Sequence, residues 1–224
     1  MPDQQRSILI TGAASGIGRA AAVLFAEHGW LVGAADRDAA GLASLAATSA
    51  KIIPLALDVA DRAAVTEVMA NFAAHTGGSL DCLLSNAGID AKGPFGEMAW
   101  ERVRQLVEVN LLGAMSVIHA ALPLLRAAPN SLCLSTASAS AIFGVGGMAV
   151  YSATKHGVRG LTEALSVELA GSGVRAADIL PGIVDTGMLS AQDKAQLPAT
   201  GMWRVMPAQA VAQEIGRASC RERV

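Results

Sequence analysis

Short runs of aliphatic residues alternate with longer alanine-rich stretches along most of the chain, and this alternation limits the possible folds more than any other feature. The apolar runs, each interpreted as a strand, are Ile8–Ile10, Leu31–Ala35, Lys51–Leu57, Leu80–Leu84, Ser131–Leu134 and Val174–Leu180. The stretches with apolar residues at helical spacing are Gly16–His28, Ala39–Thr48, Arg62–His75, Trp100–Ala127 and Ala149–Ala170. Continuous apolar strands separated by helices favour a parallel sheet that is covered on both faces. The sequence therefore predicts a doubly wound α/β domain, a three-layer α/β/α sandwich.

Length and charge restrict the class of function. The chain has 224 residues and contains no repeat or linker that would mark a domain boundary, so we expect one domain. Its formal net charge is −2 and 16% of its residues are charged, which gives no electrostatic footprint for nucleic acid or for an acidic membrane. We also expect no window to approach the ~20 apolar residues of a membrane span.

Three cysteines and the N-terminal residues bear on the compartment. Cys82 and Cys133 lie in apolar runs and Cys220 lies near the end, without a CxxC pair. This odd set predicts neither a disulfide framework nor a metal site. The residues before Ser7 lack the pattern of a signal peptide. We therefore expect a protein of the reducing cytoplasm.

A glycine-rich turn follows the first predicted strand and opens a predicted helix. Its sequence is Thr11-Gly12-Ala13-Ala14-Ser15-Gly16-Ile17-Gly18. Glycines at these positions permit a tight turn and a close approach of the backbone to a pyrophosphate, which the helix N-terminus then binds. A glycine triplet alone is weak evidence, and its place after the first strand strengthens it.

Asp36 ends the second predicted strand, about twenty residues after the glycine turn. A carboxylate there can accept hydrogen bonds from adenosine ribose hydroxyls and repels a 2′-phosphate, so NAD is favoured over NADP. Arg37 follows directly and can offset the repulsion, so NADP stays possible. The alternative is that Asp36 is a solvated turn residue.

Two further polar motifs follow the third and fourth predicted strands. Asp58-Val59 ends one of them and Asn86-Ala87-Gly88 ends the other. Each is an ordinary turn signal by itself. Both are expected at the carboxyl edge of the sheet, where ligands bind in open α/β folds.

Tyr151 and Lys155 are four residues apart at the start of a predicted helix, so they project from one face. An ammonium beside a phenol stabilises the phenolate, and we expect it to lower the pKa of Tyr151 and make this residue a general acid and base. Ser138 lies thirteen residues earlier, where a hydroxyl can hold a substrate carbonyl. Ser135 and Ser140 compete for that role, and periodicity does not choose among the three.

Asn110 interrupts an otherwise apolar helix. A buried amide at such a place is more often the partner of a local helix kink than a catalyst, unless it anchors a water molecule.

Together these motifs resemble the short-chain dehydrogenase/reductase family in its single-domain form, over about Ser7 to Glu214. The matching positions, in order, are Thr11-Gly12, Gly16-Ile17-Gly18, Asp58, Asn86-Ala87-Gly88, Asn110, Ser138, Tyr151, Lys155, Pro181-Gly182 and Thr186. The resemblance implies a Rossmann-type fold that binds NAD(P). Family alignment also selects Ser138 over its two neighbours.

The resemblance implies a catalytic tetrad of Asn110, Ser138, Tyr151 and Lys155. Tyr151 would exchange a proton with the substrate oxygen, Lys155 would also bind the nicotinamide ribose, and Asn110 would hold a water molecule that links the lysine to solvent. The cofactor contacts implied by motif or position are Gly12, Ser15, Gly16, Ile17, Gly18, Asp36, Asp58, Val59, Asn86, Ala87, Gly88, Asn110, Tyr151, Lys155, Pro181, Gly182, Val184 and Thr186.

The implied activity is hydride transfer between NAD(P) and a small or medium apolar secondary alcohol or ketone. An NADPH-dependent 3-oxoacyl reductase and a cofactor-binding protein without turnover are the alternatives. Family members are commonly oligomers, so a homodimer or homotetramer of the full-length parent is expected.

The last ten residues, Ile215–Val224, depart from the family pattern. They correspond to one reading of a common sequencing-adapter DNA, so we expect a native domain of residues 1–214, truncated at its C-terminal part, and a foreign tail of residues 215–224. A natural basic C-terminus is the alternative. The irregular stretch Gly187–Met206 is interpreted as a lid or binding loop, with an exposed surface loop as its alternative.

Overall fold

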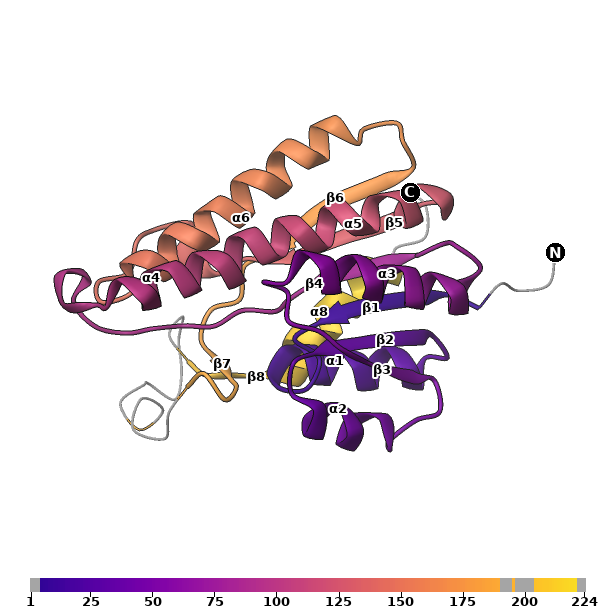
Figure 1. The fold of residues 1–224 in the computed structure, drawn as a ribbon, viewed down its shortest axis with the longest axis horizontal. Helices are drawn as coiled ribbons and strands as arrows, with labels where there is room; N and C mark the ends of the chain where they lie inside the picture. The colour runs from indigo at the N-terminus through magenta and orange to yellow at the C-terminus, as the bar shows by residue number, and fades with distance from the viewer. Residues whose placement is uncertain (1–4, 190–194, 196–203, 221–224) are drawn as a thin grey trace.

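The computed structural model describes residues 5–189, 195 and 204–220, and these form a parallel sheet between two layers of helices (Figure 1). The strands of the sheet are β1 (Ser7–Thr11), β2 (Leu31–Asp36), β3 (Ile52–Ala56), β4 (Cys82–Ser85), β5 (Ser131–Thr136) and β6 (Val174–Ile179). Their order is β3-β2-β1-β4-β5-β6, with every neighbouring pair parallel. The order reverses between β1 and β4, which is where ligands bind in open α/β sheets.

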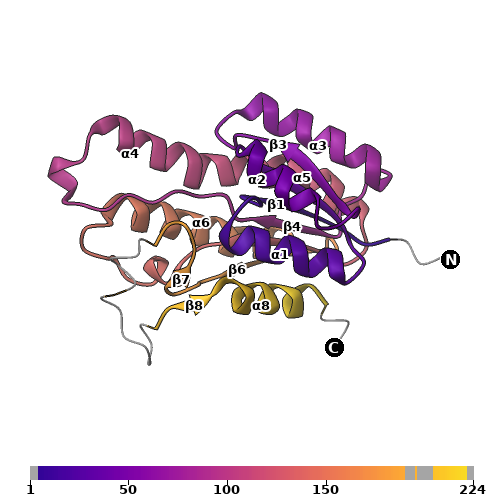
Figure 2. The ribbon, with the colours of Figure 1, turned by 90° about the horizontal axis from the view of Figure 1, so that it is seen from below.

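Helices cover both faces of the sheet (Figure 2). One layer consists of α1 (Gly16–Glu27), α2 (Ala39–Ala46) and α8 (Ala208–Cys220). The other consists of α3 (Arg62–Thr76), α4 (Trp100–Val107), α5 (Ala114–Ala127) and α6 (Ala149–Glu168). Shorter elements are the 3-10 turns η1 (Phe95–Glu97) and η3 (Ala139–Ala141), the π-helical turn η2 (Glu108–Gly113), and the strand pair β7 (Val184–Asp185) with β8 (Met206–Pro207). The predicted three-layer fold is confirmed.

The central strands β1, β4 and β5 are rich in apolar residues because both of their faces are buried. In β1, Ile8 and Ile10 pack with α1 and α8, whereas Leu9 packs with α3 and α5, and all three side chains are fully buried. Outside the strands, the carboxylate of Asp61 caps α3 by accepting the backbone N–H groups of Ala63 and Ala64.

The main difference from the sequence prediction lies in the segment 100–127. We expected one helix, and the structure has α4, the π-helical turn η2 and α5 in its place. Asn110 lies in this turn, and its side chain bonds the backbone of Ile89 in the loop after β4. A long-range hydrogen bond thus coincides with the change of helical geometry. Strand pair β7–β8 and the bounds of α8 were also not predicted.

The same segment satisfies the length and hydropathy criteria for a membrane-crossing helix. The most apolar window within Trp100–Ala127 has a mean hydropathy of 1.5, so the expectation that no window comes close was wrong for this stretch. Half of that window is buried inside the fold. Val117 and Leu125, which have no exposed surface, place this helix in the core of the α/β domain.

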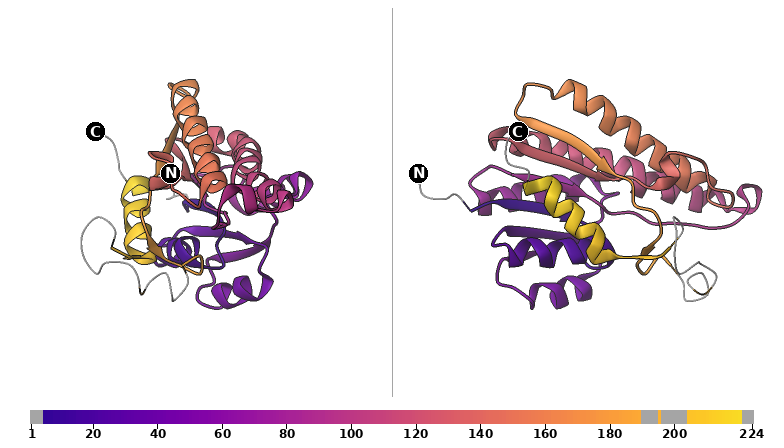
Figure 3. Two further views of the ribbon diagram at one scale, coloured as in Figure 1. Left: turned by 90° about the vertical axis from the view of Figure 1, so that its left-hand side faces the viewer. Right: turned by 180° about the vertical axis from the view of Figure 1, so that it is seen from behind.

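Helix α8 packs along α1 on the outside of the sheet (Figure 3). Val211, Ala212 and Ile215 of α8 are buried in the core on this side. The domain boundary expected after Glu214 therefore falls inside a helix, between a surface residue and a fully buried one.

Candidate active site

The glycine-rich turn lies at the carboxyl end of β1 and packs against the end of β4. Gly12 and Gly16 have φ angles of +69° and +53°, in the left-handed region that favours glycine. A Cβ atom on Gly12 would lie 2.9 Å from Cα of Ala87, and one on Gly18 would lie 2.1 Å from the carbonyl oxygen of Gly12. The close packing of α1 on the strand needs glycine and leaves the helix N-terminus suited to a pyrophosphate.

Three side chains tie the carboxyl ends of β1, β4 and β5 together, and we call Thr11, Asn86 and Thr136 the Asn86 junction. Asn86 Nδ2 donates to the carbonyl oxygens of Thr11, at 3.1 Å, and Gly12, at 3.4 Å. Thr11 Oγ1 accepts the backbone N–H groups of Asn86 and Ala87, and Thr136 Oγ1 donates to Asn86 Oδ1 at 3.2 Å. The predicted Asn86-Ala87-Gly88 motif is thus fixed against the glycine turn.

Asp36 ends β2 beside the glycine turn, as predicted. Its Oδ2 accepts the backbone N–H of Ala14 at 2.9 Å, and its Oδ1 accepts that of Asp38 at 3.0 Å. The carboxylate is half-buried and is held in one orientation by the two backbone groups. This arrangement holds the Asp36 carboxylate beside the glycine turn, near the N-terminus of α1.

Tyr151 lies in the first turn of α6, and its phenol hydrogen-bonds the side chain of Ser138. Ser138 precedes η3 and accepts the backbone N–H of Ser140 at 3.2 Å. Of the three serines considered from the sequence, Ser138 is the one whose side chain acts on the pKa of Tyr151. Both competitors are buried, with 1% and 6% of their surfaces exposed.

The environment of the phenol differs from the sequence expectation. Burial raises the pKa of Tyr151 above its usual value of 10, the hydrogen bond from Ser138 lowers this pKa in part, and the negative charge of Asp90 raises it. The prediction that Lys155 lowers the pKa of Tyr151 was therefore wrong, because this pKa is raised and Lys155 is not among the groups that shift it. Burial also lowers the pKa of Lys155 to about 8, so this amine has lost its proton at the pH where the phenol ionises.

Lys155 follows Tyr151 by one helical turn and is 4% exposed. Its Nζ lies 5.7 Å from the centre of the Tyr151 ring and donates to the carbonyl oxygen of Thr136 at 2.7 Å. A Cβ atom on Gly88 would lie 3.6 Å from this Nζ and 3.4 Å from Asn110 Oδ1. The side chains of Lys155 and Asn110 therefore both lie close to Gly88, just after the end of β4.

Asn110 is 1% exposed and spans two segments. Its Oδ1 accepts the backbone N–H of Ile89, and its Nδ2 donates to the carbonyl oxygen of Ile89, both at 2.8 Å. The second N–H of the amide donates to Thr154 Oγ1 at 3.3 Å. Both amide protons therefore bond protein atoms, which matches the helix-kink interpretation; the water-holding role of Asn110 stays a prediction.

The segment Pro181–Thr186 also approaches the glycine turn. The carbonyl oxygen of Pro181 accepts the backbone N–H of Ala139 at 2.9 Å, next to Ser138. Gly182 is exposed, and Val184 lies in β7. At the far end, a Cβ atom on Gly16 would lie 2.9 Å from Thr186 Cγ2. This segment therefore links the serine side of the site to the phosphate side.

The remaining predicted contacts lie at the same edge of the sheet with different exposure. Ser15 is exposed at the N-cap position of α1, and Ile17 packs partly into the core. Asp58 is exposed and accepts the backbone N–H of Ala60. Val59 is buried, and its Cγ2 would lie 2.8 Å from a Cβ on Gly113.

Three residues of the site were not singled out from the sequence. Thr136 holds Asn86 and Lys155, Thr154 bonds Asn110, and Asp90 acts on the phenol of Tyr151. The signal for Thr154 was its place in the Tyr-x-x-Thr-Lys sequence. Most of the predicted lid Gly187–Met206 lies outside the described residues.

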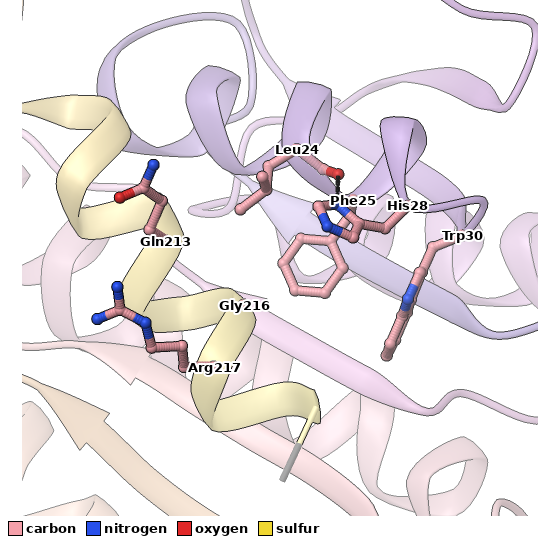
Figure 4. Close-up of a pocket in the computed structure, with 7 residues that line it drawn as sticks. All are labelled: Leu24, Phe25, His28, Trp30, Gln213, Gly216 and Arg217. Atoms are coloured by element: carbon pink, nitrogen blue, oxygen red, sulfur yellow. Dashed lines mark hydrogen bonds between the residues drawn. The ribbon is translucent and has the colours of Figure 1, made fainter.

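The surface hollows found in the described part of the chain lie away from this site. One, of about 290 Å³, is lined by Leu24, Phe25 and Trp30 on one side and by α8 on the other (Figure 4). A second, of about 370 Å³, lies between α3 and α5. The site is therefore identified by converging side chains and the glycine turn, not by the size of a cavity.

Comparisons with known proteins identify the family to which this chain belongs. The sequence pattern of the family described as short chain dehydrogenase matches residues 6–197. A 3-oxoacyl-[acyl-carrier-protein] reductase of Thermotoga maritima is 35% identical over 184 residues, which cover 80% of this chain and 74% of the relative. Levodione reductase of Leifsonia aquatica is 35% identical over 191 residues, covering 82% and 71%.

Solved structures agree with these relatives. A crystal structure of levodione reductase superposes with a TM-score of 0.89 at 27% identity, covering 97% of this chain and 93% of that one. The 3-ketoacyl-(acyl-carrier-protein) reductase from Brucella melitensis, complexed with NADH, gives a TM-score of 0.87 at 27% identity, covering 96% and 93%. With the fold and motifs described above, this chain belongs to the short-chain dehydrogenase/reductase family and is an NAD(P)-dependent oxidoreductase.

Proposed function

We propose that the protein transfers a hydride between NAD(P) and a secondary alcohol or ketone, with Tyr151 as the general acid and base. One observation carries this proposal: the phenol of Tyr151 hydrogen-bonds Ser138 one helical turn before a fully buried lysine. A buried amine, a phenol and a hydroxyl at the carboxyl edge of the sheet form a proton-transfer group beside a phosphate-binding turn.

The residues of the chain divide the chemistry in the following way. Tyr151 Oη gives its proton to the carbonyl oxygen in reduction and takes it back in oxidation, while Ser138 Oγ holds that oxygen against the phenol. Lys155, whose amine donates to the carbonyl oxygen of Thr136, would bind the nicotinamide ribose. Bound NAD(P) would supply or accept the hydride.

The protonation state favours one direction at neutral pH. Because burial raises the pKa of Tyr151 above 10, the phenol carries its proton at pH 7 and is ready to donate it in carbonyl reduction. Oxidation needs the phenolate. We therefore propose that alcohol oxidation by this protein increases with pH.

NAD is the proposed cofactor. The glycine turn has the close contacts that a pyrophosphate site needs, and the two backbone bonds of Asp36 hold its carboxylate where ribose hydroxyls are bound in this type of fold. A 2′-phosphate would meet this negative charge. Arg37 is exposed beside Asp36 and is the residue through which NADP stays possible.

An apolar substrate is proposed. Ile142, Phe143 and Met188 are large apolar side chains with 61%, 46% and 45% of their surfaces exposed, in the segments that follow η3 and β7. Leu189 is also described, whereas Leu197, Met202 and Trp203 lie outside the described residues. A 3-oxoacyl reductase, the activity in the names of the Thermotoga and Brucella proteins, is the second candidate.

A cytoplasmic homodimer or homotetramer is the proposed state of the full-length parent. Leu112, Met115 and Val167 are exposed apolar residues on the outer side of η2, α5 and α6, with 52%, 38% and 76% of their surfaces exposed. Exposed apolar side chains on long helices are suited to helix packing between copies.

The test is the variant Tyr151→Phe, which keeps the ring and removes the proton. With a panel of secondary alcohols and ketones, we expect kcat to fall by about 10²–10⁴ while the affinity for NADH, measured by fluorescence titration, changes little. Full activity in this variant would rule out the acid and base role of Tyr151. NADH binding without any turnover by the unmodified protein would favour the cofactor-binding alternative.

A further inference from the structure

Thr154 connects the Tyr151 turn of α6 to Asn110, two parts of the site that lie far apart in the sequence. It lies on α6 between Tyr151 and Lys155 and is 1% exposed. Its hydroxyl donates to the carbonyl oxygen of Tyr151 at 2.7 Å and accepts an N–H of Asn110 at 3.3 Å. Because the proton of the hydroxyl is engaged with Tyr151, the oxygen lone pairs are left to receive Asn110.

The bond from Asn110 continues to the end of β4. The same amide clamps the Ile89 peptide from both sides, with Oδ1 accepting its N–H and Nδ2 donating to its carbonyl oxygen. A chain of hydrogen bonds thus runs from the Tyr151 turn of α6, through the π-helical turn η2, to the loop that follows Gly88. Figure 1 shows α6 running alongside the α4–α5 helix, which contains this turn.

We propose that Thr154 is a positioning residue, whose hydroxyl holds the Tyr151–Lys155 turn of α6 in register with Asn110 and the loop after β4. The inference rests on the proposed function. Lys155 Nζ and Asn110 Oδ1 both lie near Gly88, so a small displacement of α6 changes the separation of these groups. Misplacement of reacting groups lowers the rate of the chemical step more than it lowers binding.

Thr162 provides a matched control on the same helix. It is also buried, with 4% of its surface exposed, and its hydroxyl donates to the carbonyl oxygen of Val158 at 3.0 Å. Replacing either threonine by valine removes a buried hydroxyl and a bond to the helix backbone at nearly constant volume. Only the change at Thr154 also removes the acceptor of one Asn110 N–H, while the two bonds of Asn110 to Ile89 stay available. Thr154→Ser keeps the hydroxyl and should preserve the connection.

The experiment compares Thr154→Val, Thr154→Ser and Thr162→Val by steady-state kinetics and by hydrogen exchange. In Thr154→Val we expect kcat to fall about tenfold with the KM for NAD(H) within about twofold, and the Ile89 amide to exchange about tenfold faster. Thr154→Ser and Thr162→Val should keep both quantities near those of the unmodified protein. Wild-type kcat in Thr154→Val, or an equal loss in Thr162→Val, would overturn the proposal.

Hydrogen exchange separates this inference from the proposed function, because it needs no turnover. If the unmodified protein turns over no substrate, the proposed function fails. The exchange rate of the Ile89 amide then tests the positioning role of Thr154 by itself. Faster exchange in Thr154→Val but not in Thr162→Val supports the connection. Unchanged exchange in Thr154→Val refutes it, whatever the activity.

Discussion

Lys155 Nζ lies 5.7 Å from the centre of the Tyr151 ring, one turn along α6, and its bond to the Thr136 carbonyl oxygen directs the amine toward β5. The amine of Lys155 therefore lies beside the ring of Tyr151 and donates its described hydrogen bond to β5. Burial acts on the two groups in opposite directions, since it raises the pKa of the phenol and lowers that of the amine.

The phenol can be titrated directly, because Tyr151 is the only tyrosine in the chain. Ser138→Ala removes the hydrogen bond that lowers the pKa of Tyr151, so this pKa should rise, and Asp90→Asn removes a negative charge, so it should fall. We expect each shift to be on the order of half a pKa unit or more. Ultraviolet absorbance of the phenolate against pH measures both.

Glu168→Gln is the control for this titration, because Glu168 is an exposed carboxylate at the opposite end of α6. Its pH curve should overlay that of the unmodified protein. A phenol in the unmodified protein that titrates at or below pH 10 would contradict the burial argument.

Lys155 should make the stability of the protein depend on alkaline pH. Its pKa is about 8 in the folded protein against 10.5 in the unfolded chain, so between these values the unfolded chain binds more protons and stability rises with pH. The penalty for burying the charged amine is fully present below pH 8. Relative to Lys155→Met, the free energy of unfolding should increase by about 3 kcal/mol across the window.

Urea unfolding of the two proteins at a series of pH values measures this difference. The buried thiols of Cys82 and Cys133, whose pKa values rise to about 12, oppose the trend in each protein, because the unfolded chain loses their protons first. They are present in both proteins and cancel in the comparison. A difference that stays constant from pH 7 to pH 10 would be inconsistent with a desolvated Lys155.

Asp36 should control the choice between the two nicotinamide cofactors. Asp36→Asn keeps an oxygen acceptor for the backbone and removes the charge, whereas Asp36→Ala removes both. We expect the ratio of NADH to NADPH affinity to fall about tenfold or more in both variants, with a larger loss of NADH affinity in Asp36→Ala. Fluorescence titration with each cofactor gives the ratio, and an unchanged ratio in Asp36→Asn would disprove the charge argument.

Two glycine substitutions should have opposite effects on stability. In Gly18→Ala the new Cβ would lie 2.1 Å from the Gly12 carbonyl oxygen, so α1 must move away from the strand and both folding and NADH binding should suffer. Gly160 lies on α6 and is exposed, and a Cβ atom added there would meet no neighbouring group within 4 Å outside its own helix turn. Gly160→Ala should therefore stabilise the protein by up to about 1 kcal/mol. Thermal unfolding of the pair checks both directions.

The strand and helix order was predictable because it depends on local patterns. Residues with apolar neighbours on both sides, such as Leu9 and Leu83, are buried between the two helical layers. The alternation of such apolar runs with helical stretches can be seen directly in the sequence. The turn at Asn110 was not predictable in this way. Its geometry depends on the Ile89 backbone, twenty-one residues distant in the chain, and no local propensity encodes that contact.

The same distinction holds within the site. Tyr151 and Lys155 could be paired from their spacing on one helix. The raised pKa of the phenol could not be predicted in this way, because it depends on burial and on the charge of Asp90, which the tertiary fold brings near. Thr136 and Thr154 act through partners on other elements. The boundary expected after Glu214 stays a prediction, since the continuity of α8 across it does not identify the origin of the residues that follow.

The Asn86 junction couples parts of the site that a redesign would otherwise treat separately. It fastens the glycine turn to the strand end that anchors Lys155, so substitutions at Thr11 or Thr136 should disturb nucleotide binding and proton transfer together. The carboxylate of Asp36 also bonds this turn, at the backbone N–H of Ala14, as well as the N–H of Asp38. A redesign of the proposed cofactor preference at the β2 end therefore acts on the same turn that the junction ties to Lys155, and its effect on turnover needs to be measured together with its effect on binding.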